Sequence, residues 1–76
     1  MMTEAGFLDE LGAILDQPGP LARGQKLGEI ETFDSLGILN IMALFDTLGL
    51  EVEPSRIAEA ATTDDLLSIA GTKLQA

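Results

Sequence analysis

Apolar side chains at helical spacing, interrupted by helix breakers, constrain the fold of this chain more than any other feature. In the N-terminal segment such residues recur every three to four positions, at Phe7, Leu8, Leu11, Ile14 and Leu15. This spacing is typical of one buried helix face, and Thr3 suits the N-cap position. The run Gln-Pro-Gly-Pro at residues 17–20 cannot extend a helix, because proline lacks an amide donor and restricts the residue before it. We therefore predict a first helix over residues 3–16.

A long loop is predicted after this helix, over residues 17–33. Its apolar residues are spaced too irregularly for a helix or a strand: Leu21, Leu27, Ile30 and Phe33. A connection of this length without regular structure is uncommon inside a small domain. Since the loop carries this many apolar side chains, we expect it to pack against the helices and not to be disordered.

The second helix is predicted to begin at Asp34 or Ser35, both good N-cap residues, and to run to about Leu48. Gly49 is a natural stop. The side chains predicted to face the core are Ile38, Ile41, Met42, Phe45 and Leu48. The opposite face carries Leu36, Leu39, Asn40, Ala43 and Thr47. Several of these are apolar where a solvent-facing surface is usually charged.

Two shorter helices complete the predicted fold. Proline suits a first helical turn, which predicts a short third helix over residues 54–59. A last helix is predicted to start near Thr62 or Thr63, followed by two aspartates whose charge is favourable there, and Gly71 ends or frays it. Its inward side chains are predicted to be Leu66, Leu67, Ile69, Ala70 and Leu74. The predicted fold class is all-α, a single small four-helix domain over residues 1–76.

The composition removes most catalytic chemistry. The 76 residues include neither cysteine nor histidine. The chain therefore has no thiolate nucleophile, no disulfide and no usual general base near neutral pH. The carboxylates do not follow a calcium-loop pattern either. We expect no metal site and no enzyme activity of the chain alone, and a small acidic metal-binding or enzymatic domain has little support.

The charge of the chain limits its partners. The formal charge is −9, from 13 acidic and 4 basic residues, and would repel nucleic acids and anionic lipid surfaces. We expect no nucleic-acid and no membrane partner. The acidity fits equally a solvated surface and docking to basic partners.

The chain has no apolar stretch of membrane-spanning length and no basic secretory start, which predicts a cytoplasmic protein.

The tetrad Phe33-Asp34-Ser35-Leu36 stands where the predicted loop meets the second helix. A helix start presents unpaired amides and the positive end of the helix dipole, which suits an attached phosphate. With the tetrad in this position, the chain resembles the acyl and peptidyl carrier proteins, whose Asp-Ser-Leu motif opens the second helix. The resemblance covers most of the chain and implies a monomeric four-helix bundle of the acyl-carrier type. The other interpretation is that Asp34 or Ser35 is only an N-cap.

The resemblance also implies a cofactor and a set of partners. Ser35 would be esterified by 4′-phosphopantetheine, supplied from coenzyme A by a phosphopantetheinyl transferase. The arm's thiol would hold an acyl or aminoacyl group as a thioester. A loading enzyme (an adenylating ligase or an acyltransferase) and a downstream transferase or synthase would be further partners. We expect a standalone carrier protein of a specialised pathway, and the bulk of Phe45 and Met42 favours a short or polar cargo, including an aminoacyl group.

The residues predicted to be recognised by partners are Asp34, Leu36, Leu39, Asn40 and Ala43. Asp34 can instead act only as a cap, and Leu36 only as a buried contact. Fatty-acid carriers have acidic residues on the outward face of this helix, at positions where this chain has Gly37 and Asn40. We therefore expect an apolar docking stripe in place of an acidic one. The alternative function is an unmodified carrier-like module that binds proteins through the same face.

Overall fold

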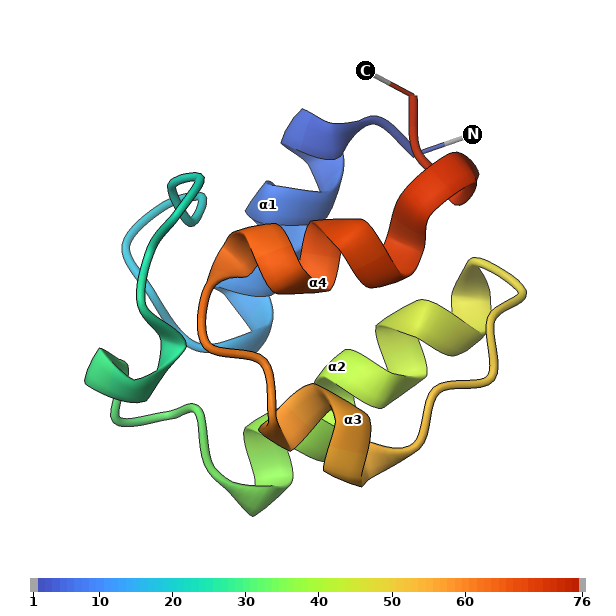
Figure 1. Cartoon of the computed structure of the whole chain (residues 1–76). Helices are drawn as coiled ribbons and strands as arrows, with labels where there is room; N and C mark the ends of the chain where they lie inside the picture. The colour runs from blue at the N-terminus through green and yellow to red at the C-terminus, as the bar shows by residue number, and fades with distance from the viewer. Residues whose placement is uncertain (1, 76) are drawn as a thin grey trace.

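Four α-helices joined by a long first loop make up the fold (Figure 1). The structure, a computed structural model, describes residues 2–75. Its elements are α1 (Glu4–Ile14), the 3₁₀ turn η1 (Leu27–Glu29), α2 (Ser35–Thr47), α3 (Pro54–Ala58), α4 (Thr63–Ala70) and the 3₁₀ turn η2 (Gly71–Lys73). The described residues form no strand, only two isolated bridges. The prediction of an all-α fold with four helices is thus confirmed.

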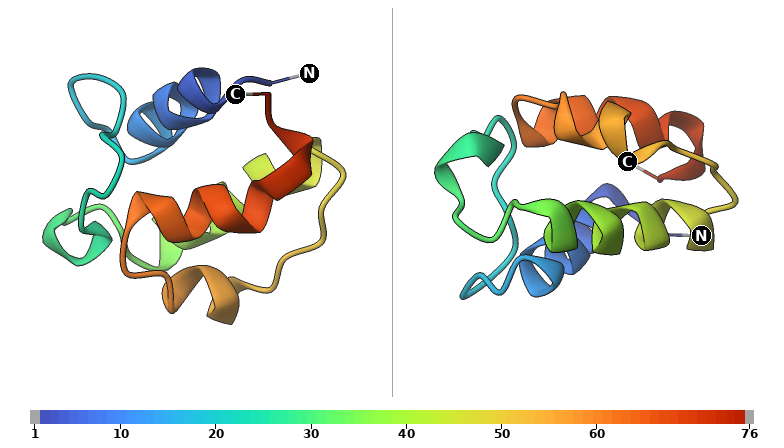
Figure 2. Two further views of the ribbon diagram at one scale, coloured as in Figure 1. Left: turned by 45° about the horizontal axis from the view of Figure 1, so that its top comes forward. Right: turned by 90° about the horizontal axis from the view of Figure 1, so that it is seen from below.

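The helices pack around one shared core. α4 lies over α1 and α2, and α3 lies beside the start of α2 (Figures 1 and 2). The two chain ends meet, because the Glu4 N–H donates to the Gln75 carbonyl at 2.8 Å and the Gln75 N–H to the Met2 carbonyl at 3.0 Å. None of the helices described over residues 2–75 is both long and apolar enough to cross a membrane.

Helix α1 begins as predicted and ends two residues earlier. The Gly6 N–H donates to the Thr3 hydroxyl at 3.0 Å, which makes Thr3 the N-cap. After Ile14 the chain leaves the helix through Asp16, whose φ of 56° is in the left-handed region. The Gln17 N–H then donates to the Gly12 carbonyl at 2.8 Å, which closes a Schellman-type end. An aspartate in this position carries a weaker sequence signal than a glycine, so the predicted end at residue 16 was wrong.

The long loop is packed, as predicted. Leu21, Leu27 and Ile30 are buried in the core. One side chain of α4 makes two of the hydrogen bonds that anchor the loop: the buried Thr63 hydroxyl donates to the Ala22 carbonyl at 2.6 Å and accepts from the Gln25 N–H at 3.2 Å. Backbone groups of the loop, which has little regular structure, thus form hydrogen bonds to a residue far away in the sequence.

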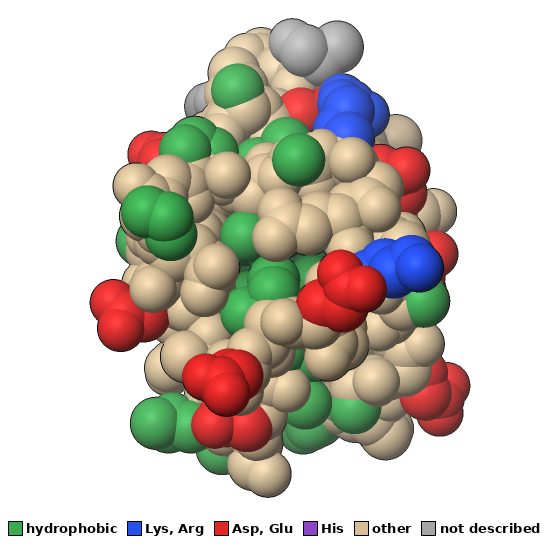
Figure 3. Space-filling view, turned by 90° about the vertical axis from the view of Figure 1, so that its left-hand side faces the viewer, with side chains coloured by type: hydrophobic (Ala, Val, Ile, Leu, Met, Phe, Trp, Pro, Cys, Tyr) green, Lys and Arg blue, Asp and Glu red, His purple; other side chains and the backbone are tan. Residues whose placement is uncertain are grey.

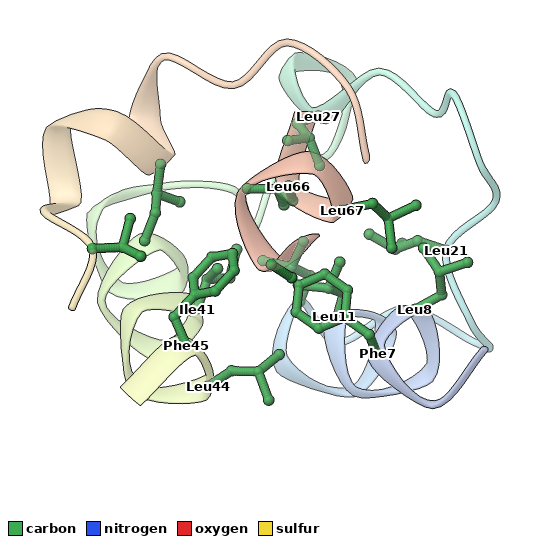
Figure 4. Packing of buried hydrophobic residues seen from close by; sticks show 14 of the residues in the cluster. Phe7, Leu8, Leu11, Leu21, Leu27, Ile41, Leu44, Phe45, Leu66 and Leu67 are labelled. Atoms are coloured by element: carbon green, nitrogen blue, oxygen red, sulfur yellow. The ribbon is translucent and has the colours of Figure 1, made fainter. Parts of the chain in front are cut away.

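The core joins side chains from all four helices and the loop (Figure 4). Its buried members are Phe7, Leu8, Leu11, Leu15, Leu21, Leu27, Ile30, Ile41, Leu44, Phe45, Val52, Ile57, Leu66, Leu67 and Ala70. The rings of Phe7 and Phe45 contact one another with centroids 5.6 Å apart and planes tilted by 49°. Of the side chains predicted to point inward from the last helix and beyond, Ile69 and Leu74 are only partly buried.

The predicted inward face of α2 packs against the core, and burial also extends beyond it on one side. Ile41 and Phe45 are fully buried, while Ile38, Met42 and Leu48 are half-buried. Gly37 and Leu44, which were not predicted to face inward, are also buried. Ile38 and Met42 line open grooves on the α3 side, which explains their partial exposure.

The starts of the two last helices follow the sequence signals. α3 opens with Pro54 in its first turn and ends at Ala58, one residue before the predicted end. α4 opens at Thr63 with Thr62 as its N-cap in a capping box. The Asp65 carboxylate accepts from the Ala61 N–H at 2.8 Å and completes this turn.

Candidate functional site

The start of α2 is capped by Asp34. Its backbone is extended, with φ −120° and ψ −169°, and its carboxylate accepts from the Gly37 N–H at 3.0 Å. The Ile38 N–H donates to the Asp34 carbonyl at 2.8 Å, which is the first helical hydrogen bond. Since Asp34 takes the capping role, Ser35 is left as the first residue of the helix proper.

Ser35 is exposed at this helix start. Within residues 2–75 its hydroxyl takes part in no hydrogen bond, and the amides of Ser35 and Leu36 have no acceptor. These groups are the unpaired donors that every helix start leaves available to a ligand or to water. Ser35 is therefore accessible from solvent in the folded protein.

The segment before Ser35 is held by close packing at Gly37. A Cβ at Gly37 would lie 2.3 Å from the Thr32 carbonyl oxygen and 3.0 Å from the Leu15 side chain. The Thr32 hydroxyl also donates to the Leu15 carbonyl. Gly37 is thus buried between the end of α1 and the loop. The expectation that this position lies on the outward face of the helix was wrong.

Replacing Gly37 with alanine is expected to destabilise the protein by up to about 2 kcal/mol, because forcing atoms into a packed site typically costs about 1–3 kcal/mol and alanine recovers only about 1 kcal/mol by favouring a helix. Urea unfolding followed by circular dichroism measures this difference. Gly28→Ala is the matched control, since a Cβ there meets nothing within 4 Å. If Gly37→Ala were as stable as Gly28→Ala, the close packing at the start of α2 would be refuted.

The outward face of α2 is apolar near Ser35. Among residues 2–75, two large hydrophobic side chains are exposed, Leu36 at 68% and Leu39 at 48%. Leu36 is therefore not the buried first-turn contact considered as its alternative role. Asn40 and Ala43 are also exposed, one and two turns further along the same helix. The structure thus places every residue predicted for partner recognition at the surface, on α2 or at its cap.

Two open grooves lie along α2, where it packs beside α3 and the loop before α3. The first, which we call the Ser35 groove, has a volume of about 280 Å³. It is lined by Ser35, Ile38, Leu39, Pro54, Ser55 and Ala58. The second has a volume of about 570 Å³ and shares Pro54 with the first. Sequence reasoning missed both grooves and the position of Ser55 in the lining of the first, because nothing in the spacing of residues predicts where α3 packs.

Charge is spread over the surface. On the side at the left of Figure 1, acidic side chains are scattered with hydrophobic ones between them (Figure 3). In α2 the charged side chain is Asp46, near the end remote from Ser35. Among the described residues 2–75, no group of three or more acidic side chains is arranged to hold a metal ion. The immediate surroundings of Ser35 therefore offer exposed hydroxyl, amide and apolar groups beside the Asp34 carboxylate.

No protein-family model matches the chain, and none of the curated proteins or solved structures compared with it matches either.

Proposed function

We propose that this chain is a carrier protein that holds an acyl or aminoacyl group as a thioester on a 4′-phosphopantetheine arm attached to Ser35. The observation that carries the proposal is the exposed Ser35 hydroxyl at the first position of α2, left free because Asp34 caps the helix. In the resembling carrier family the modified serine occupies this position in the Asp-Ser-Leu motif.

Attachment would use Ser35 as the nucleophile. Its Oγ forms a bond to the phosphorus next to pantetheine in coenzyme A, and the pyrophosphate bond breaks. Adenosine bisphosphate leaves, and a base of the transferase takes the hydroxyl proton. The chain supplies no histidine for that step. The arm contributes the thiol that carries the cargo, which this cysteine-free chain lacks.

The residues around Ser35 fit a phosphate-linked arm. The Ser35 and Leu36 amides are donors that favour a phosphodiester at this helix start. The Ser35 groove carries no charged side chain and offers a second hydroxyl, that of Ser55. This combination suits an arm built of apolar carbons and neutral amides. No residue of the groove lining would repel the phosphate.

Partner enzymes would dock on α2 through an apolar stripe, which we define as Leu36, Leu39 and Ala43. Exposed apolar residues that lie together usually mark an interaction site, whereas a single exposed leucine does not. The stripe begins next to Ser35, so a transferase seated on it would have its reactive groups close to the hydroxyl. Asn40 and Asp34 border this surface.

Replacing Leu39 with aspartate is expected to lower kcat/KM of a phosphopantetheinyl transferase for this protein by about tenfold, because an unpaired carboxylate in an apolar interface loses its hydration without compensation. Asp46→Lys on the same helix is the matched control and should change kcat/KM by less than about threefold. A large effect of Asp46→Lys with none of Leu39→Asp would contradict the apolar stripe and favour charge recognition.

Incubation of the protein with coenzyme A and a broad-specificity phosphopantetheinyl transferase tests the proposed function. Mass spectrometry should show the gain of one phosphopantetheinyl group, located on Ser35 by fragmentation. A chain that never gains the group would instead be an unmodified interaction module, a function that the exposed Leu36 and Leu39 also support.

A further inference from the structure

The wider groove differs in chemistry from the Ser35 groove. It is lined by Met42, Ala43, Asp46, Leu50, Glu51, Val52, Glu53 and Pro54. Five of these residues are apolar and three are acidic, and none is basic. Val52 is buried and Met42 half-buried, while the three acidic residues are exposed. We call this cavity of about 570 Å³ the acidic groove.

The two grooves follow one another along α2. Pro54 lines both, and the α2 residues of the Ser35 groove precede those of the acidic groove. From Ser35 to Asp46 the helix advances eleven residues, or about 16 Å at 1.5 Å per residue. A phosphopantetheine arm has about fifteen atoms from the serine oxygen to the sulfur, as many as five residues of backbone, which span about 16–18 Å when extended. The arm is therefore long enough for its end to reach the acidic groove.

The two grooves differ in charge, and this difference indicates which chemical group the acidic groove would bind. An arm of neutral amides meets no charged side chain in the Ser35 groove, whereas a group at the far end meets three carboxylates. Because the described carboxylates are not grouped closely enough for a metal ion, the complementary occupant is an organic cation. Met42, which is half-buried, and Val52, which is buried, form an apolar floor that favours a cation with an apolar part.

We propose that the acidic groove selects an aminoacyl cargo with an apolar side chain. The side chain would lie against the apolar floor, and the α-ammonium would face Asp46, Glu51 and Glu53. This inference rests on the proposed carrier function, and it deepens that function by naming the class of cargo. A neutral acyl group of the same shape would keep the apolar contacts and lose the attraction of the carboxylates.

A matched pair of probes tests the charge preference. Leucyl and 4-methylpentanoyl groups have the same shape apart from the ammonium, and each can be linked by a stable amide to a pantetheine analogue in which an amine replaces the thiol. Titrated into Ser35→Ala protein and followed by NMR shifts of Met42 and Val52, the leucyl probe should bind about three- to tenfold more tightly, as expected for a cation near exposed carboxylates. This preference should fall in high salt.

The variant with Asp46→Asn, Glu51→Gln and Glu53→Gln separates charge from shape. It should bind the two probes equally, with the affinity that the wild-type groove shows for the neutral one. Glu29→Gln with Glu31→Gln, outside the lining of either groove, is the control and should leave the preference unchanged.

The same two groups attached to Ser35, from the corresponding amide analogues of coenzyme A, test the reach of the arm. The leucyl form should shift the Met42 and Val52 signals more strongly than the neutral form. Equal binding of the free probes, or shifts confined to residues outside the acidic groove, would overturn the cargo inference while leaving the carrier function intact. A protein that cannot be modified at all would overturn the carrier function, and the free probes would still report on the groove.

Discussion

Replacing Ser35 with alanine is expected to abolish the uptake of a phosphopantetheinyl group completely. The substitution removes the one oxygen that forms the phosphodiester, and no neighbouring side chain can take its place at the first position of α2. The reaction with coenzyme A and a transferase, followed by intact-protein mass spectrometry, gives an all-or-none readout. The Ser35 hydroxyl is exposed and makes no hydrogen bond within residues 2–75. The free energy of unfolding of the variant should therefore differ from that of the wild type by no more than about 0.5 kcal/mol.

Ser55→Ala is the matched control for this experiment. Ser55 lines the same groove and also stands in the first turn of a helix, so it shares the general setting of Ser35. It lacks the preceding aspartate cap, because the residue before Pro54 makes no side-chain cap. Ser55→Ala should be modified like the wild type. Uptake by Ser35→Ala, or a group located on Ser55 by fragmentation of the modified wild type, would contradict the proposed attachment site.

The sequence predicted the helices and the position of Ser35 because both depend on local chemistry. The spacing of Phe7, Leu11 and Leu15 reports one helix face, and the Asp-Ser-Leu tripeptide follows a loop that cannot be helical. Gly49, with φ 81°, ends α2 where a glycine stop was expected. The packing of the long loop was also predictable, because a loop with many apolar side chains must bury them.

The features that sequence reasoning missed depend on contacts between distant segments. The burial of Gly37 follows from the Thr32 carbonyl and the Leu15 side chain, which approach it from two other elements. The anchoring of the loop by Thr63 joins residues about forty positions apart along the chain. The two grooves beside α2 depend on where the short helix α3 lies. Periodicity within one segment carries no information on such contacts.

Replacing Phe45 with alanine is expected to destabilise the protein by about 3–5 kcal/mol, the usual cost of removing a buried aromatic ring. Phe45 is 0% exposed and packs against Phe7 from the other side of the core. The total stability expected for a 76-residue domain is about 4–11 kcal/mol, so this single loss would remove a large part of it. Thermal unfolding followed by circular dichroism should show a midpoint lowered by about 15–30 °C.

Leu39→Ala is the matched control, because Leu39 lies on the same helix with 48% of its surface exposed and should change the midpoint little. A Phe45→Ala protein as stable as Leu39→Ala would refute the core packing of α2.

Substitutions on the two faces of α2 should have opposite effects on folding and on modification. Phe45→Ala should weaken folding and affect modification only through the unfolded fraction, whereas Ser35→Ala should block modification in a protein that remains folded. Such a separation is expected only if the reactive hydroxyl belongs to the surface of a helix whose position is maintained by the core beneath it.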